Sequence, residues 1–135
     1  MVSTRPLAFL AALAVACGLA ACGGSDSGDA KSALNSYLTA FAKGDGKKAC
    51  SLMTTQTRAQ FVTRVKALTR TTDCAKSVGT LKPVMAAALR GANVTQVKVA
   101  GSEAAATVRA GKRESTTLLR KEGGKWKVSA GPGTQ

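Results

Sequence analysis

Residues 93–130 decide the fold, and they read NVTQVKVAGSEAAATVRAGKRESTTLLRKEGGKWKVSA. Three glycine-containing pairs divide this stretch into four segments: Gly101-Ser102, Gly111-Lys112 and Gly123-Gly124. Pairs of this kind form two-residue loops between antiparallel strands. With such loops, the sequence numbers of two residues that face each other across a hairpin add up to 203 in the first hairpin, 223 in the second and 247 in the third.

The three turns agree on which side chains share a face of this predicted sheet. Side chains alternate between the two faces along a strand, and the three registers place small and apolar residues together. The members of this face are Thr95, Val97, Val99, Ala104, Ala106, Val108, Ser115, Thr117, Leu119, Trp126 and Val128. A slip of one residue in any hairpin would break the agreement. The sequence therefore predicts a four-stranded antiparallel meander with one face turned inward.

Residues 29–92 show helical spacing instead. Apolar residues recur on one helix face at Ala33, Leu34, Tyr37, Leu38 and Phe41, and Gly44 ends that helix. Asp29 and Asp45 are expected to cap this helix and the next. Further helices are expected over 47–53, over 58–68 with Phe61, Val62, Val65 and Leu68 inward, over 73–78, and over 84–90 with Pro83 in its first turn. Several helices followed by a meander predict an α+β fold, with the helices packed on one face of the sheet.

The first residues of the chain predict a secretory signal. Residues 1–6 carry Arg5, residues 7–16 are apolar, and small residues precede Cys22. The apolar run is too short for a membrane span, which needs about 20 residues. The stretch Leu19-Ala20-Ala21-Cys22 resembles the bacterial lipobox. This resemblance implies that Cys22 is lipidated and begins the mature chain; the alternative is an ordinary cleaved signal with an incidental cysteine.

The resulting organisation has four parts. Residues 1–21 are the predicted lipoprotein signal peptide, and residues 22–30 are the lipidated cysteine with a flexible, glycine-rich tether. Residues 31–131 are the predicted domain, and residues 132–135 are a tail. The expected location is the extracytoplasmic face of the cell membrane, because two acyl chains hold a protein on a bilayer.

The chain has four cysteines, and the signal accounts for two of them. Cys17 leaves with the signal peptide and Cys22 takes the lipid, so that Cys50 and Cys74 remain in an oxidising compartment. We expect these two to form a disulfide; the alternative is two free buried thiols. A bridge that closes about 25 residues would stabilise the domain by about 3–4 kcal/mol in the chain-entropy model.

Three short stretches resemble the nuclear transport factor 2-like (cystatin-like) family. Residues 37–45 (YLTAFAKGD) resemble the end of its first helix, and residues 118–128 (LLRKEGGKWKV) resemble its closing hairpin. Residues 49–54 (ACSLMT), followed by residues 58–61 (RAQF), resemble its secreted, cysteine-paired actinobacterial lipoproteins. The resemblance implies a cone of helices wrapped by a curved sheet. The chain departs from the family in its short final strand.

Little in the sequence points to catalysis. The chain has no histidine and only seven acidic residues, and none of the acids falls on the predicted inward face. It carries no CxxC, no glycine-rich phosphate loop and no metal-ligand cluster. We therefore expect no enzyme, no cofactor and no metal. If the cone holds a pocket, its expected walls are Tyr37, Phe41, Phe61 and Trp126. Tyr37 is then the best polar candidate; its alternative role is that of an aromatic residue at the edge of the core.

The remaining signal is charge. Lys and Arg total 20 against seven acids, a formal net charge of +13, and residues 29–92 hold 11 basic and three acidic residues. The basic surface predicts contact with anionic lipid headgroups or wall polymers, for which Lys47, Lys48 and Arg58 are candidates; simple solubility is the alternative. Nucleic acid is not an expected partner.

Two functions follow from these observations. The first is a lipid-anchored binding or accessory domain that contacts envelope polymers or an envelope protein. The second is a small-molecule carrier or degenerate enzyme that uses the cone pocket.

Overall fold

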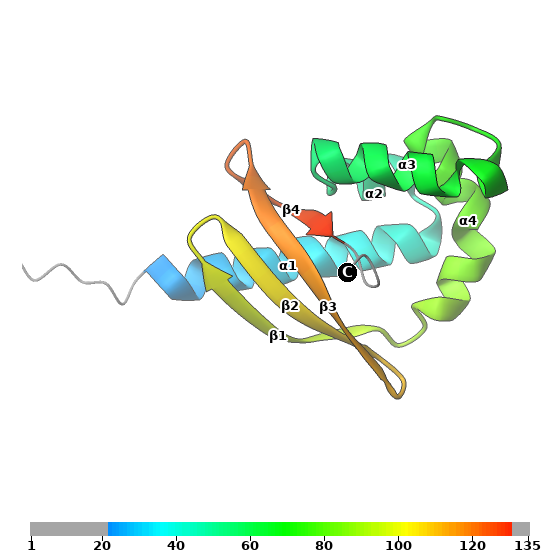
Figure 1. Ribbon diagram of the computed structural model, residues 1–135. Coiled ribbons are helices and arrows are strands. Elements are labelled where there is room, and N and C mark those ends of the chain that lie inside the picture. Colours follow the sequence, from blue (N-terminus) through cyan, green and yellow to red (C-terminus); the bar gives the residue numbers. More distant parts are fainter. Residues whose placement is uncertain (1–21, 131–135) are drawn as a thin grey trace, which may run out of the picture.

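A computed structural model describes residues 22–130 of the chain (Figure 1). The predicted signal peptide over residues 1–21, the tail over residues 132–135 and the side chain of Cys22 lie outside this description. Four helices come first: α1 (Cys22–Lys43), α2 (Gly46–Ser51), α3 (Thr55–Thr69) and α4 (Cys74–Ala88). Four strands follow: β1 (Asn93–Ala100), β2 (Glu103–Ala110), β3 (Arg113–Glu122) and β4 (Lys125–Ala130). The α+β arrangement is therefore confirmed.

The strands form one antiparallel sheet in the order β1-β2-β3-β4. The predicted pairs Val97–Ala106, Ala106–Thr117 and Leu119–Val128 are all present. The inward position of Thr95 is wrong, because the register shifts between Val94 and Gln96. This bulge turns Val94 inward, where it is buried, and leaves Thr95 exposed.

Helix α1 runs across the inner face of the sheet (Figure 1). Ala30, Leu34 and Leu38 on one face of α1 pack against Val94 of β1 and Leu119 of β3. Ala30 and Leu34 are fully buried there. The same cluster includes Ala104, Ala106, Val108, Trp126 and Val128. The apolar helix face and the apolar sheet face that the sequence predicts therefore meet in one core.

The structure differs from the expected flexible tether, because residues 22–30 belong to α1. Two contacts explain why this glycine-rich stretch is helical: Ala30 is fully buried, and the Asp26 carboxylate lies 2.8 Å from the Lys121 ammonium of β3. Lys121 also lies over the Trp126 ring, 5.2 Å from its centroid. These tertiary contacts outweigh the low helix propensity of glycine, which costs about 1 kcal/mol per residue relative to alanine. Asp29 consequently lies inside the helix and does not cap it.

Helices α2, α3 and α4 surround a second core cluster at the C-terminal end of α1. Its buried members are Ala40, Phe41, Ala49, Cys50, Met53 and Val78. Cys50 of α2 and Cys74 of α4 form the predicted disulfide, with Cα atoms 6.2 Å apart. Asp45 caps α2 as expected, since its carboxylate accepts from the Lys48 N–H. The disulfide and the cluster together hold the three short helices.

Two expectations about the helices are wrong. A single helix, α4, replaces the two expected on either side of Pro83. Val78 and Met85 flank the proline and pack on the same cluster. Pro83 has no N–H to donate to the Gly79 carbonyl, but Gly79 and Pro83 are exposed, so water can reach that carbonyl. Leu68 of α3 is 74% exposed and does not point inward.

Gly46 is required where α2 meets α4. A Cβ at this position would lie 2.5 Å from the Ala75 Cα and closer still to the Ala75 carbonyl oxygen. Because the Cys50–Cys74 bridge keeps the two helices from separating, we expect Gly46→Ala to lower the free energy of unfolding by about 1–3 kcal/mol. Urea titration of both proteins measures this difference.

The matched control is Gly79→Ala on the exposed side of α4, where an added Cβ meets nothing within 4 Å. This substitution should leave stability unchanged or raise it by up to about 1 kcal/mol. Equal urea midpoints for the two variants would contradict the close contact.

Candidate functional site

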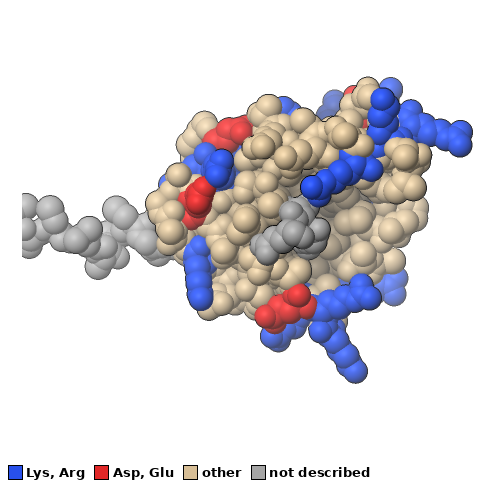
Figure 2. Space-filling model, in the orientation of Figure 1, with Lys and Arg blue, Asp and Glu red and all other residues tan. Residues whose placement is uncertain are grey.

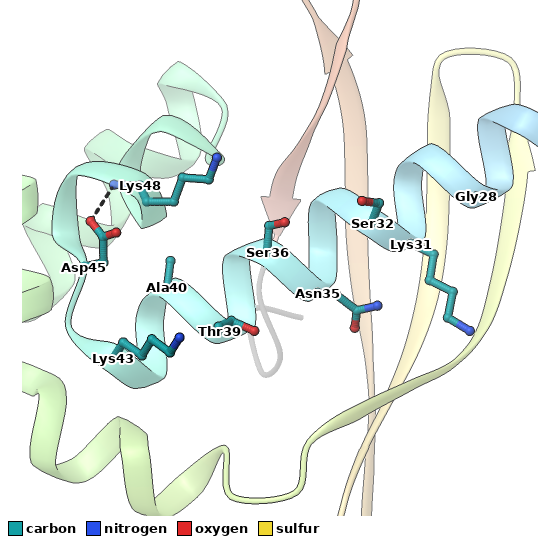
Figure 3. Close-up of a pocket in the computed structure, with 10 residues that line it drawn as sticks. All are labelled: Gly28, Lys31, Ser32, Asn35, Ser36, Thr39, Ala40, Lys43, Asp45 and Lys48. Atoms are coloured by element: carbon teal, nitrogen blue, oxygen red, sulfur yellow. Dashed lines mark hydrogen bonds between the residues drawn. The ribbon is translucent and has the colours of Figure 1, made fainter.

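A groove of about 590 Å³ follows one face of α1 and ends against α2 (Figure 3). Its lining residues on α1 recur every three or four positions and so share a helix face: Gly28, Lys31, Ser32, Asn35, Ser36, Thr39, Ala40 and Lys43. Leu34 and Leu38, on the opposite face, are buried against the sheet. Burial of one face of α1 therefore leaves this polar face open.

The groove is cationic and polar. Lys31 and Lys43 come from α1, and Lys48 comes from α2. Figure 3 shows Lys31 toward one end and Lys43 and Lys48 toward the other, with hydroxyl and amide side chains between them. The Lys48 backbone N–H donates to the Asp45 carboxylate at 3.1 Å. This acid therefore serves the start of α2, and the groove keeps an excess of positive charge.

Among residues 22–130, ion pairs involve basic residues of the sheet but none of the helices. The four pairs among residues 22–130 are Arg109–Glu114 at 2.8 Å, Arg120–Glu103 at 2.6 Å, Lys121–Asp26 at 2.8 Å and Lys127–Glu122 at 3.7 Å. Every basic partner belongs to a strand. Within the described chain, the 11 basic residues of positions 29–92 make no such pair. Figure 2 shows acidic side chains beside basic ones over the strands, and basic side chains projecting at the helical end.

Glu122 links the sheet to a helix start. Its carboxylate accepts from the Thr55 N–H at 3.1 Å and from the Thr55 hydroxyl at 2.9 Å. The hydrogen bond from the Thr55 N–H has the largest effect and lowers the pKa of the Glu122 carboxyl. The bond from the Thr55 hydroxyl and the nearby Lys127 lower this pKa further. Lys125 faces Glu122 across the β3–β4 hairpin, but the ion pair of Glu122 is with Lys127 at 3.7 Å.

The predicted contact residues occupy different places on this surface. Lys48 lines the groove, whereas Lys47 and Arg58 are exposed on α2 and α3 and do not line it. Lys31 and Lys43 are not among the residues predicted from the sequence. The pattern that could have indicated them is the recurrence of polar residues along α1 at helical spacing, on the face opposite to apolar residues such as Leu34 and Leu38.

A second, apolar cavity of about 250 Å³ lies between α1, α3, α4 and the end of β4. Three of the four predicted pocket residues, Tyr37, Phe41 and Phe61, line it. The Phe41 ring centroid lies 5.5 Å from that of Tyr37 and 5.5 Å from that of Phe61. Met53, Met85, Thr57, Gln60 and Arg64 are among the other lining residues.

Trp126 is not part of this cavity, so its predicted place is wrong. It lies on the inner face of β4 in the cluster beneath α1, next to Lys121. Strand β4 lies at the edge of the sheet, where it pairs with β3 and, through a bridge between Val128 and Met53, with the segment between α2 and α3. The sequence predicts the face of a strand residue but not which helix covers it.

Comparison of the chain with protein-family models, with curated proteins and with solved structures finds no match. The helices of residues 22–130 include no candidate for a bilayer-spanning segment. In the same described region, no three His, Cys, Asp or Glu side chains gather as metal ligands would. The groove and the cavity are therefore the two features from which function is inferred.

Tyr37 allows the cavity to be tested in solution. Burial raises the pKa of its phenol to about 12, and it is the only tyrosine in the chain. We expect tyrosinate absorbance to rise with a midpoint near pH 12 in the folded protein and near pH 10 in denaturant. The neutral phenol is favoured by the fold, so this contribution to stability is complete below pH 10 and is lost as the pH rises toward 12.

The control is Tyr37→Phe, which should abolish the absorbance change and remove this part of the alkaline loss of stability. A midpoint near pH 10 in the folded protein would show that the phenol is open to water.

Proposed function

We propose that this protein is a lipid-anchored domain on the extracytoplasmic face of a bacterial membrane, where its helical layer binds anionic material of the envelope. The observation that carries the proposal is the charge of that layer. Residues 29–92 hold 11 basic and three acidic side chains. Among the described residues, all four ion pairs use basic side chains of the strands instead.

Two of the three acids of the helical layer have local roles. The Asp45 carboxylate accepts from the Lys48 N–H, and the Asp73 carboxylate accepts from the Lys76 N–H. Both acids cap helices and stabilise their N-termini. The basic side chains are left to interact with a partner. Each basic residue near an anionic surface contributes about 1 kcal/mol, so several acting together give useful binding.

The lipobox-like residues 19–22 support the anchor. Two acyl chains on Cys22 would hold the protein stably on a bilayer. Asp26, four residues after Cys22, is already paired with Lys121 of the sheet. The domain would therefore follow its anchor directly, without a long linker, and would act close to the membrane and the wall polymers around it.

We also assign the domain to the nuclear transport factor 2-like fold. The support is the order of helices and meander and the course of α1 across the inner face of the sheet. The disulfide between α2 and α4 agrees with the resemblance of residues 49–54 and 58–61 to cysteine-paired lipoproteins of that family.

The apolar cavity favours a second candidate function, a carrier of a small apolar molecule or a degenerate enzyme. Its volume of about 250 Å³ lies slightly below the range of about 300–1,000 Å³ usual for ligand pockets. An apolar compound that enters it would contact the Tyr37 phenol and shift its titration, so the measurement described above also tests this candidate.

The anchor predicts the behaviour of a Cys22→Ala chain expressed in a bacterium. Without the thiol that takes the lipid, the protein should remain unprocessed or leave the membrane for the medium. Membrane fractionation and the mass of the mature chain measure this. A Cys17→Ala chain is the control and should behave as the wild type. Normal maturation and membrane retention of Cys22→Ala would show that residues 19–22 are not a lipobox.

The charge of the helical layer predicts binding by the chain of residues 22–135 with Cys22→Ser, which keeps every described helix and strand. This protein should bind anionic phospholipid vesicles or an anionic wall polymer, and binding should weaken steeply with salt. Two triple variants are compared by sedimentation: Lys47→Gln, Lys48→Gln and Arg58→Gln on the helices, and Lys98→Gln, Lys112→Gln and Lys125→Gln on the sheet.

The helical triple should lose more affinity than the sheet triple, although both remove three charges. Absence of binding to both probes at low salt would mean that the charge serves solubility alone.

A further inference from the structure

We propose that the groove along α1 binds one strand of a linear, phosphate-bearing polymer lengthwise. This inference rests on the proposed function and names the site and the ligand class behind it. Lys31, Lys43 and Lys48 would contact the phosphates, and the uncharged floor between them, which includes Asn35 and Thr39, would contact the polar repeating units.

The length of the groove suits an extended strand. The groove has a volume of about 590 Å³, and its lysines on α1 are 12 residues apart in the sequence, about 18 Å along a helix. A single polymer strand is narrow enough to follow the floor from Lys31 to Lys43 (Figure 3).

The charges of the groove are available to a ligand. Lys31, Lys43 and Lys48 take part in none of the ion pairs among residues 22–130. The one acid that lines the groove, Asp45, is held by the Lys48 N–H at 3.1 Å. The positive groups lie toward both ends of the groove, so a polymer that carries negative charge at intervals can meet them at both ends.

Helix stability does not explain the polar residues that line the floor of the groove. Ser32, Asn35, Ser36 and Thr39 line it, and serine, asparagine and threonine are weaker helix formers than Ala, Glu, Lys or Gln. Asn35 and Thr39 are exposed, and the side-chain hydrogen bonds among the described residues include neither of them. Their amide and hydroxyl groups are therefore available to a ligand that is itself polar.

The residue types suit phosphate. The cations are three lysines, and lysine binds phosphate as a point charge. No aromatic side chain lines the groove, so it offers no surface on which the bases of a single-stranded nucleic acid would stack.

The test uses the chain of residues 22–135 with Cys22→Ser and long-chain inorganic polyphosphate as the probe. The groove variant carries Lys31→Gln, Lys43→Gln and Lys48→Gln. The control variant carries Lys66→Gln, Lys76→Gln and Arg90→Gln, which are exposed positions outside the groove, the first two on helices and the third in the turn after α4. We expect the groove variant to bind polyphosphate at least tenfold more weakly than wild type, and the control variant to lose less than about threefold.

A second variant separates the groove from charge in general. Asn35→Ala with Thr39→Val leaves the net charge unchanged, and circular dichroism checks that the helix is intact. Contact with the floor predicts at least threefold weaker binding of polyphosphate. An unchanged affinity would overturn the role of the floor, because diffuse electrostatic attraction does not depend on these two residues.

The outcomes distinguish this inference from the proposed function. If the groove and control triples weaken binding equally, while wild type still binds polyphosphate or anionic vesicles, the groove is not the site and the proposed function stands. If wild type binds neither probe at low salt, the proposed function fails as well. Equal affinity for polyglutamate would overturn the preference for phosphate, and equal affinity for single-stranded DNA would overturn the exclusion of nucleic acid.

Discussion

The packing of α1 against the inner face of the sheet is the contact on which the rest of the structure depends. Ala30 and Leu34 are fully buried against the inner face of the sheet, and this burial explains why the glycine-rich start of the helix is ordered. Because an α-helix has two opposite faces, covering one of them with the sheet leaves the other open until α2 meets it near Ala40. The polar groove is that exposed face, so the core and the candidate site are two sides of one element.

The disulfide has a comparable role at the far end of α1. Helix α2 has only six residues, too few for stability without tertiary contacts. The Cys50–Cys74 bridge and the absence of a side chain at Gly46 hold it against α4. Lys48 thereby comes to lie at the end of the groove beside Lys43. A covalent bond in the core thus positions a charge on the surface.

Charge is divided between the two layers in a way that the overall balance does not reveal. The three acids on the strands and Asp26 at the start of α1 pair with basic residues of the sheet, whereas the acids at positions 45 and 73 cap helices. Among residues 22–130, the basic residues without an ion pair therefore lie mostly on the helical layer, 11 at positions 29–92 against four at positions 93–130. In the proposed function, the sheet secures the helix that follows the anchor and the helices meet the anionic partner.

Local pattern was enough to predict the meander, its register in all three hairpins and the disulfide, because each depends on turn residues, on alternation or on the few cysteines available. The bulge at Thr95, the helical state of residues 22–30 and the continuity of α4 through Pro83 depend on contacts between distant segments, and there packing outweighed local preference.

The same division holds for the sites. The aromatic residues of the apolar cavity were predictable from their helical spacing, apart from Trp126, whose place depends on which helix covers β4. The groove required the tertiary structure, because only the burial of Leu34 and Leu38 against the sheet shows that Lys31 and Lys43 share the open face of α1, and only the fold brings Lys48 to them.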